Sequence, residues 1–246
     1  MELKLNLKQL ALVFAATVLL CGAVSAGDLV FESGLKKVQL LELFTSEGCS
    51  SCPPAEAALT RLMSDPRLWR EFVPVAFHVD YWDHLGWKDP FARGDWTRRQ
   101  RQYAANWRGD TVYTPAFVLD GREWRGATVP VATGDPAGNL KLWRRSNELF
   151  AVSFEPAKPG NFDAYVGRLG FGVISNVRAG ENSGRTFRDD FIVLSLASEK
   201  LTSPIQEFRL PAVGLDQKVQ KTAVAVWVTK SGEITPIQAT GGWLPN

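Results

Sequence analysis

The sequence is poor in cysteine, histidine and methionine. Its 246 residues include three cysteines, two histidines and two methionines. Scaffolds stapled by several disulfides need many paired cysteines, so that class of protein is excluded. The chain also contains no internal repeat and no low-complexity tract, which excludes a solenoid or a fibrous protein.

An excess of charge of one sign is also missing. The 28 lysines and arginines nearly balance the 26 aspartates and glutamates, and the formal net charge is +2. Proteins that bind nucleic acid usually carry a strong basic excess that neutralises phosphates. The composition therefore predicts that nucleic acid is not a partner.

Long hydrophobic runs are confined to the N-terminus. Lys4 and Lys8 precede an apolar stretch from Leu10 to Leu20, and the small residues of 24–26 follow it. This arrangement predicts a secretory signal peptide over residues 1–26, with retention as an anchor as the alternative. We therefore expect an exported protein, periplasmic or secreted, that is not stably inserted in a membrane after cleavage.

Cleavage at this point would remove Cys21 and leave Cys49 and Cys52 as the remaining cysteines. A disulfide between residues three apart closes a very short loop, and such a loop restrains little unfolded-state entropy. Stabilisation of the folded state by this disulfide is thus a poor explanation for the pair of cysteines. An exported compartment would keep the pair oxidised unless another molecule reduces it.

The two cysteines lie between an apolar run and a helical pattern. Residues 37–44 read as a strand that is buried on both faces, and apolar residues recur at helical spacing after the cysteines. Pro53 and Pro54 are tolerated only in the first turn of a helix, which fixes where this helix begins. Because helix N-termini favour anions, this position favours a thiolate.

The following pattern predicts a strand–helix–strand unit, an insertion and a hairpin. Residues 73–79 read as a second strand parallel to the first, and residues 81–91 as an aromatic loop. Residues 95–107 read as an inserted helix, and Asp120-Gly121 as the turn of a hairpin. Residues 139–150 are predicted to form a helix, which completes a domain over residues 27–150.

Residues 155–160 interrupt the pattern with two prolines and a glycine. Beyond them, three apolar runs read as strands, at 171–177, 191–197 and 223–229, and residues 178–185 read as a loop. We therefore predict a second, mainly β domain over residues 151–246.

A strand, a Cys-X-X-Cys motif and a helix, followed by a hairpin and a helix, resemble the thioredoxin fold. The predicted fold class is an α/β thioredoxin-like domain (βαβ, helical insertion, ββα) followed by a mainly β domain. The resemblance implies that Cys49 is an exposed attacking thiol and Cys52 a buried resolving thiol. It also implies a cis-proline at Thr114-Pro115 facing the dithiol, where the backbone before Pro115 can pair with a substrate peptide.

Glu42 is an acid within an otherwise apolar strand, where an unpartnered carboxylate is costly. The resemblance implies a proton-transfer role toward the resolving thiol, provided that the loop before Cys49 is one residue longer than in thioredoxin. The alternative is an acid at the end of a strand that faces a polar pocket.

The end of the second strand should lie beside the dithiol. We therefore predict that the wall of the site is formed by His78, Asp80, Tyr81, Trp82 and Asp83, together with Thr114. An alternative is a copper or zinc site made by Cys49, Cys52 and His78, because thiolates and imidazoles are ligands for both metals.

Several longer blocks resemble the DUF1223 family, which comprises exported bacterial proteins of the thioredoxin-like superfamily with no assigned function. The blocks are residues 41–55, 77–83, 85–91, 112–115 and 180–186. The chain departs from the family pattern after Thr186, where Phe187-Arg188-Asp189-Asp190 replaces a more polar, histidine-bearing stretch.

These observations predict a thiol–disulfide oxidoreductase acting through Cys49 and Cys52. Its partners would be thiols or disulfides of proteins or small molecules, and it would need no cofactor. Two non-enzymatic alternatives stay open. One is metal binding or delivery through the same cysteines, and the other is a binding or assembly module with an inert disulfide.

Overall fold

The structure is a computed structural model that describes residues 29–132, 134, 136–211 and 219–245. The predicted signal peptide and Cys21 lie outside these residues. None of the helices within the described ranges is both long and apolar enough to cross a membrane.

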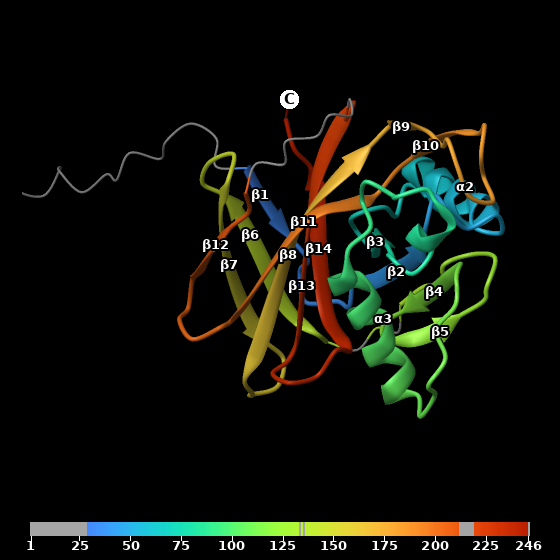
Figure 1. The fold of residues 1–246 in the computed structure, drawn as a ribbon. Helices are drawn as coiled ribbons and strands as arrows, with labels where there is room; N and C mark the ends of the chain where they lie inside the picture. Colours follow the sequence, from blue (N-terminus) through green and yellow to red (C-terminus); the bar gives the residue numbers. More distant parts are fainter. Residues whose placement is uncertain (1–28, 133, 135, 212–218, 246) are drawn as a thin grey trace, which may run out of the picture.

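Strands dominate the described chain (Figure 1). They are β1 (Leu29–Glu32), β2 (Gln39–Thr45), β3 (Phe72–His78), β4 (Ala116–Leu119), β5 (Arg122–Trp124), β6 (Gly138–Arg144), β7 (Leu149–Pro156), β8 (Phe162–Phe171), β9 (Val173–Asn176), β10 (Thr186–Asp189), β11 (Ile192–Lys200), β12 (Gln206–Arg209), β13 (Lys221–Lys230) and β14 (Pro236–Trp243). The helices are α2 (Pro53–Arg61) and α3 (Gly94–Asn106), with short 3-10 turns η1 (Leu62–Ser64) and η2 (Asp83–Leu85).

An eight-stranded sheet runs through both halves of the chain. Its strand order is β14-β13-β8-β11-β3-β2-β4-β5. The strand β3 is parallel to β2 on one side and to β11 on the other. A four-stranded sheet, β1-β6-β7-β12, and the β9–β10 hairpin complete the structure.

The predicted fold class is therefore wrong. The chain is not an α/β thioredoxin-like domain followed by a separate β domain, because β11 of the second half pairs directly with β3 of the first. The hydrophobic core likewise joins the two halves, since Leu43 and Phe77 share one cluster with Trp227. Such pairing between distant strands leaves no local signal in the sequence.

The helix predicted over residues 139–150 is also wrong. This stretch forms parts of the antiparallel strands β6 and β7. Leu140 and Leu142 are fully buried while Asn139 and Lys141 are more exposed, which is the alternation of a strand with one buried face. The helix was predicted because four residues of this stretch recur at helical spacing, namely Leu140, Trp143, Asn147 and Phe150. In the structure they belong to two strands and the turn between them.

The strand β13 contributes side chains to two different hydrophobic clusters, one on each face of the sheet. Ala223, Ala225 and Trp227 belong to the core beneath the helices, whereas Val224 and Val226 face the four-stranded sheet. Successive residues of a strand point to opposite faces, so β13 is buried on both. In Figure 1 the four-stranded sheet lies at the left and both helices at the right.

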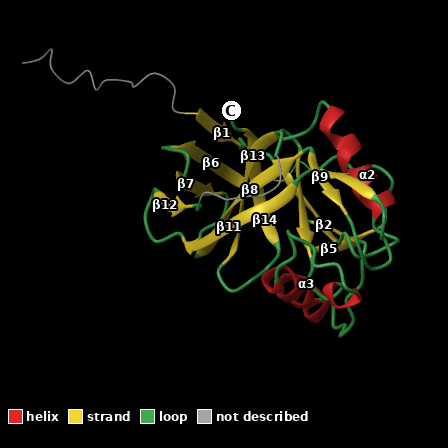
Figure 2. Cartoon of the chain, turned by 45° about the horizontal axis from the view of Figure 1, so that its top comes forward, coloured by secondary structure: helices red, strands yellow, loops and turns green. Residues whose placement is uncertain are grey.

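The helices α2 and α3 lie on opposite faces of β2 (Figure 2). Glu42 of β2 contacts Arg99 of α3, whereas Thr45 donates a hydrogen bond to Glu56 of α2. These two β2 residues differ in parity and so point to opposite faces of the sheet. This separation decides which side chains can reach the disulfide.

Candidate functional site

The strand–helix–strand unit around the cysteines forms as predicted. The strands β2 and β3 are parallel and buried along their whole length, and α2 begins at Pro53 directly after Cys52. Cys49 and Cys52 form a disulfide with a Cα–Cα distance of 5.4 Å. The disulfide therefore lies between the end of a strand and the first turn of a helix.

Both cysteines are completely buried, at 0% exposure, while Ser50 and Ser51 between them are exposed. The expectation that Cys49 is the exposed member of the pair is thus wrong in the oxidised state. The Sγ atom of Cys49 lies 3.3 Å from the Ser51 hydroxyl. A partner would meet the two serines before it meets sulfur.

The peptide bond between Thr114 and Pro115 is cis, as predicted. It adjoins the disulfide loop, because the Ser51 hydroxyl donates a hydrogen bond of 3.4 Å to the Thr114 carbonyl oxygen. The Trp82 indole donates to the Thr114 hydroxyl at 2.8 Å. A Cβ added at Gly48 would lie 3.0 Å from the Cβ atom of Trp82. Thr114 and Trp82 therefore lie against the disulfide loop, and Pro115 directly follows Thr114 in the chain.

The other predicted wall residues have different neighbours. Asp80 accepts a hydrogen bond from Thr97 of α3 at 2.6 Å, and the Tyr81 hydroxyl donates to Gln100 of the same helix. Asp83 accepts the Asp89 amide hydrogen at 3.3 Å. Asp80 and Tyr81 thus fasten the aromatic loop to α3.

Glu42 is not placed with the disulfide. It faces α3, where Arg99 donates to it at 2.6 Å and the Tyr103 hydroxyl donates to its other oxygen. The Arg99 guanidinium also lies 5.3 Å from the centre of the Trp227 ring. Burial by itself would lower the pKa of Arg99, but the adjacent Glu42 carboxylate raises it above its ordinary value. Glu42 is therefore half of a buried ion pair on the face opposite α2.

His78 forms a second buried ion pair, on the α2 side. Its Nδ1 atom lies 2.8 Å from the Asp89 carboxylate, and both side chains are almost inaccessible. Burial opposes the charge on His78, but the negative charge of Asp89 outweighs it and raises the pKa of His78 to about 10. Asp89 also accepts the backbone amide hydrogens of Glu47 and Phe91.

Further carboxylates surround this pair. Burial, and then the negative charge of Asp89, raise the pKa of Glu47 to about 7, although the Trp87 indole donates to it at 2.8 Å. Burial is also the main cause that raises the pKa values of Glu56 and Asp189. Several carboxylates therefore lie around the His78–Asp89 pair beneath the cysteine loop and α2, and burial favours the protonated form of Glu47, Glu56 and Asp189.

The loop between β9 and β10 completes the site from the far half of the chain. The Asn182 side-chain amide donates to the carbonyl oxygens of Glu47 and Cys49, both at 2.9 Å, and Glu181 accepts the Ser50 amide hydrogen at 2.9 Å. Residues 178–185 form a loop, as predicted, but no role was expected for Glu181 and Asn182. They lie 131 and 133 residues after Ser50 and Cys49, which they contact, and no local pattern indicates these contacts.

A metal site is not formed by the arrangement seen here. Across the described ranges, no three His, Cys, Asp or Glu side chains converge in a metal-binding group. One ring nitrogen of His78, the histidine of the predicted metal alternative, faces Asp89.

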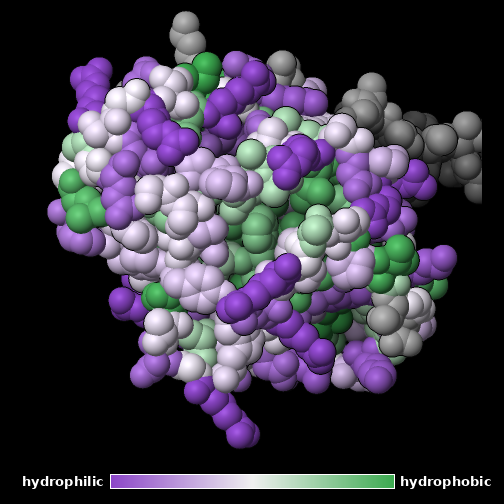
Figure 3. Space-filling model, turned by 90° about the vertical axis from the view of Figure 1, so that its right-hand side faces the viewer, coloured by the Kyte–Doolittle hydropathy of each residue, from purple (hydrophilic) through white to green (hydrophobic). Residues whose placement is uncertain are grey.

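The surface around the site is mainly polar. Figure 3 views the side that carries α2 and the β4–β5 hairpin, where hydrophilic side chains cover most of the face and hydrophobic ones gather in a central depression.

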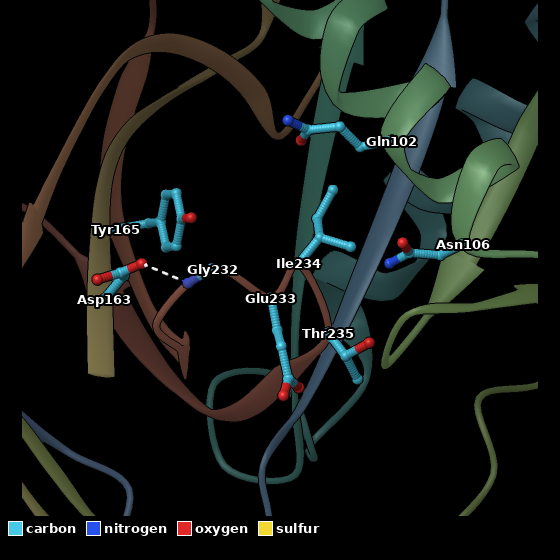
Figure 4. Close-up of a pocket in the computed structure, with 8 residues that line it drawn as sticks. All are labelled: Gln102, Asn106, Asp163, Tyr165, Gly232, Glu233, Ile234 and Thr235. Carbon is cyan, nitrogen blue, oxygen red and sulfur yellow. Dashed lines mark hydrogen bonds between the residues drawn. The ribbon is translucent and has the colours of Figure 1, made fainter. Parts of the chain in front are cut away.

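A separate cavity of about 560 Å³ lies between α3 and the β13–β14 turn (Figure 4). It is lined by Gln102, Asn106, Asp163, Tyr165, Gly232, Glu233, Ile234 and Thr235, none of which belongs to the disulfide site.

The fold and the site define a class: a mainly β protein in which a strand–helix–strand unit presents a disulfide beside a cis-proline. The DUF1223 profile, described as a protein of unknown function, matches residues 40–229. The chain belongs to the DUF1223 family, as the sequence resemblance indicated.

Two solved structures have a similar fold. One is a crystal structure of a protein from Agrobacterium tumefaciens, with 24% identity and a TM-score of 0.58, covering 85% of this chain and 95% of that one. The other is HBP35 of Porphyromonas gingivalis, with 13% identity and a TM-score of 0.59, covering 86% of this chain and 76% of that one. No curated protein matches the chain. At these identities the likeness extends to the fold alone.

Proposed function

We propose that the protein is an exported thiol–disulfide oxidoreductase that works through Cys49 and Cys52. The observation that carries this proposal is the position of the disulfide, at the first turn of α2 and next to the cis Thr114-Pro115 bond. The amides at a helix N-terminus stabilise a thiolate, so reduction of this disulfide yields a good leaving group. The charged segment, apolar run and small residues at the N-terminus support export.

The proposed reaction oxidises a substrate dithiol and reduces the protein disulfide. A substrate thiolate attacks Cys49 Sγ, which breaks the Cys49–Cys52 bond and releases the Cys52 thiolate. The second substrate thiolate then attacks the first substrate sulfur, which is bonded to Cys49, so the substrate disulfide forms and the Cys49 thiolate is released. Two electrons pass from the substrate to the protein, and the two substrate protons end on the cysteines or in solvent. The reverse sequence reduces a substrate disulfide.

One rival function has a specific observation in its favour. Both sulfur atoms are buried and the loop around them is held by Asn182, as would suit an inert disulfide in a binding module. Against this, a disulfide that closes so short a loop adds only about 2 kcal/mol of stability in the chain-entropy account.

A trapping experiment tests the proposed chemistry. Cys52→Ala removes the resolving thiol, so a mixed disulfide formed through Cys49 should persist. We expect covalent adducts on this variant in cells, released by reductant and identified by mass spectrometry. The matched control, Cys49→Ala with Cys52→Ala, should form none. If Cys52→Ala carries no more adducts than the control under both oxidising and reducing conditions, the proposed function is wrong.

A further inference from the structure

The loop between β9 and β10 makes three hydrogen bonds to the segment that contains Cys49. Asn182 is 1% exposed, and its side-chain nitrogen spans the carbonyl oxygens of Glu47 and Cys49. Its side-chain oxygen accepts a hydrogen bond from Arg185 at 2.9 Å. Every polar group of the Asn182 side chain is thus engaged, and the donors are directed at the disulfide loop.

Glu181 contacts the same loop from the surface. Its carboxylate accepts the backbone hydrogen of Ser50, the first amide after Cys49. Donors and positive charge near a cysteine favour its thiolate, whereas a nearby carboxylate opposes it. Glu181 therefore engages an amide next to Cys49 and adds a negative charge near the position where the thiolate would form. The hydrogen bond from Ser50 lowers the pKa of Glu181, so the carboxylate is ionised at neutral pH.

The 178–185 loop is itself supported from behind. A Cβ added at Gly180 would lie 3.6 Å from Leu85 Cβ, and one added at Gly86 would lie 3.5 Å from Ala179 Cβ. The aromatic loop thus packs against the backbone that carries Glu181 and Asn182. This packing fixes the two side chains relative to the disulfide.

We propose that Glu181 and Asn182 are positioning residues that hold the disulfide loop closed and disfavour its reduction. Asn182 ties the Glu47 and Cys49 carbonyl groups to the β9–β10 loop, so this segment can move on reduction only when these hydrogen bonds break. Glu181 withholds the Ser50 amide from the Cys49 thiolate. This inference rests on the proposed function, because it explains how the reactivity of that disulfide is set.

The test measures reduction by the small dithiol dithiothreitol at pH 7. One dithiothreitol thiolate attacks the protein disulfide, its second thiolate closes the reductant ring, and the protein dithiol is released. Glu181→Gln keeps the size of the side chain and removes its charge, and Asn182→Leu keeps a similar size and removes both donors without adding a charge. Ser183→Ala is the matched control, since Ser183 lies on the same loop and its hydroxyl contacts Arg178.

We expect Asn182→Leu to be reduced about 10-fold faster than the natural protein, because two hydrogen bonds are lost and no charge is added. Glu181→Gln should be reduced about 2- to 5-fold faster, since its charge is exposed and screened. Equilibration with glutathione should shift both variants, but not Ser183→Ala, toward the reduced form. A purely structural role for the loop would not shift this equilibrium without a change in melting temperature.

The inference is overturned if both variants are reduced at the rate of Ser183→Ala, or more slowly. Should Asn182→Leu fail to fold, the reduction rate and the glutathione equilibrium of Glu181→Gln test the inference alone. Failure of the proposed function is separate, because it would appear as missing adducts in the trapping experiment. Reduction by dithiothreitol needs no physiological partner.

Discussion

Replacing Arg99 with methionine is expected to lower the free energy of unfolding by about 3–5 kcal/mol. The substitution leaves the Glu42 carboxylate, which is 0% exposed, without its positive partner. Methionine has a similar volume, so the decrease in the free energy of unfolding reflects the uncompensated charge of Glu42 more than the creation of a cavity. Chemical denaturation followed by tryptophan fluorescence measures the change.

A matched control lies on the same helix. Arg98 pairs with Asp95, and both side chains are more than half exposed, at 69% and 63%. Arg98→Met should therefore change the stability by less than about 1 kcal/mol. The double variant Glu42→Leu with Arg99→Met should be more stable than Arg99→Met alone, because no buried charge is left. Equal losses for Arg98→Met and Arg99→Met would contradict this account of Glu42.

Replacing Asp89 with asparagine is expected to destabilise the protein by about 3–5 kcal/mol near pH 6. Glu47 and Phe91 donate to different oxygens of Asp89, so the variant keeps one of these two acceptors and removes the negative charge beside His78. Asp83→Asn, in the same loop and partly exposed, is the control and should lose far less.

The pH dependence of this loss has a definite sign. The folded protein raises the pKa of His78 to about 10, so its contribution is fully present below its ordinary pKa of 6.5 and is lost as pH rises through 10. The pKa of Asp89 is lowered, so its contribution is present above its ordinary value of 3.8 and is lost as pH falls through the folded value. The difference between the natural protein and Asp89→Asn should therefore be largest between these two ordinary values. A difference that grows steadily above pH 10 would contradict the assignment.

Local features of the site were predictable from the sequence. The apolar run, the spaced cysteines and the two prolines fix β2, the disulfide loop and the start of α2. Thr114-Pro115 is cis, and Asp120-Gly121 forms the hairpin turn with positive φ at both residues. Each of these features depends on residues that are close together in the chain.

The parts that depend on distant pairing were not predictable in the same way. Nothing near Ile192 indicates that β11 pairs with Ala76 of β3, and this pairing joins strands from both halves of the chain in one sheet. The partner of Glu42 is Arg99, 57 residues later in the chain. The helix expected over residues 139–150 failed because short amphipathic segments can fit both periods. The contacts of Glu181 and Asn182 were missed for the same reason as the β3–β11 pairing.

The central claim is that the Cys49–Cys52 disulfide is reactive rather than inert. The reduction potential of the pair tests it most directly, measured by equilibrating the folded protein with glutathione or dithiothreitol buffers and counting free thiols by mass spectrometry. We predict a potential above about −300 mV, in the range of disulfides that exchange with other thiols. A potential below about −300 mV, with no reactive thiol in the folded protein, would show that the disulfide is structural and would contradict the proposed function.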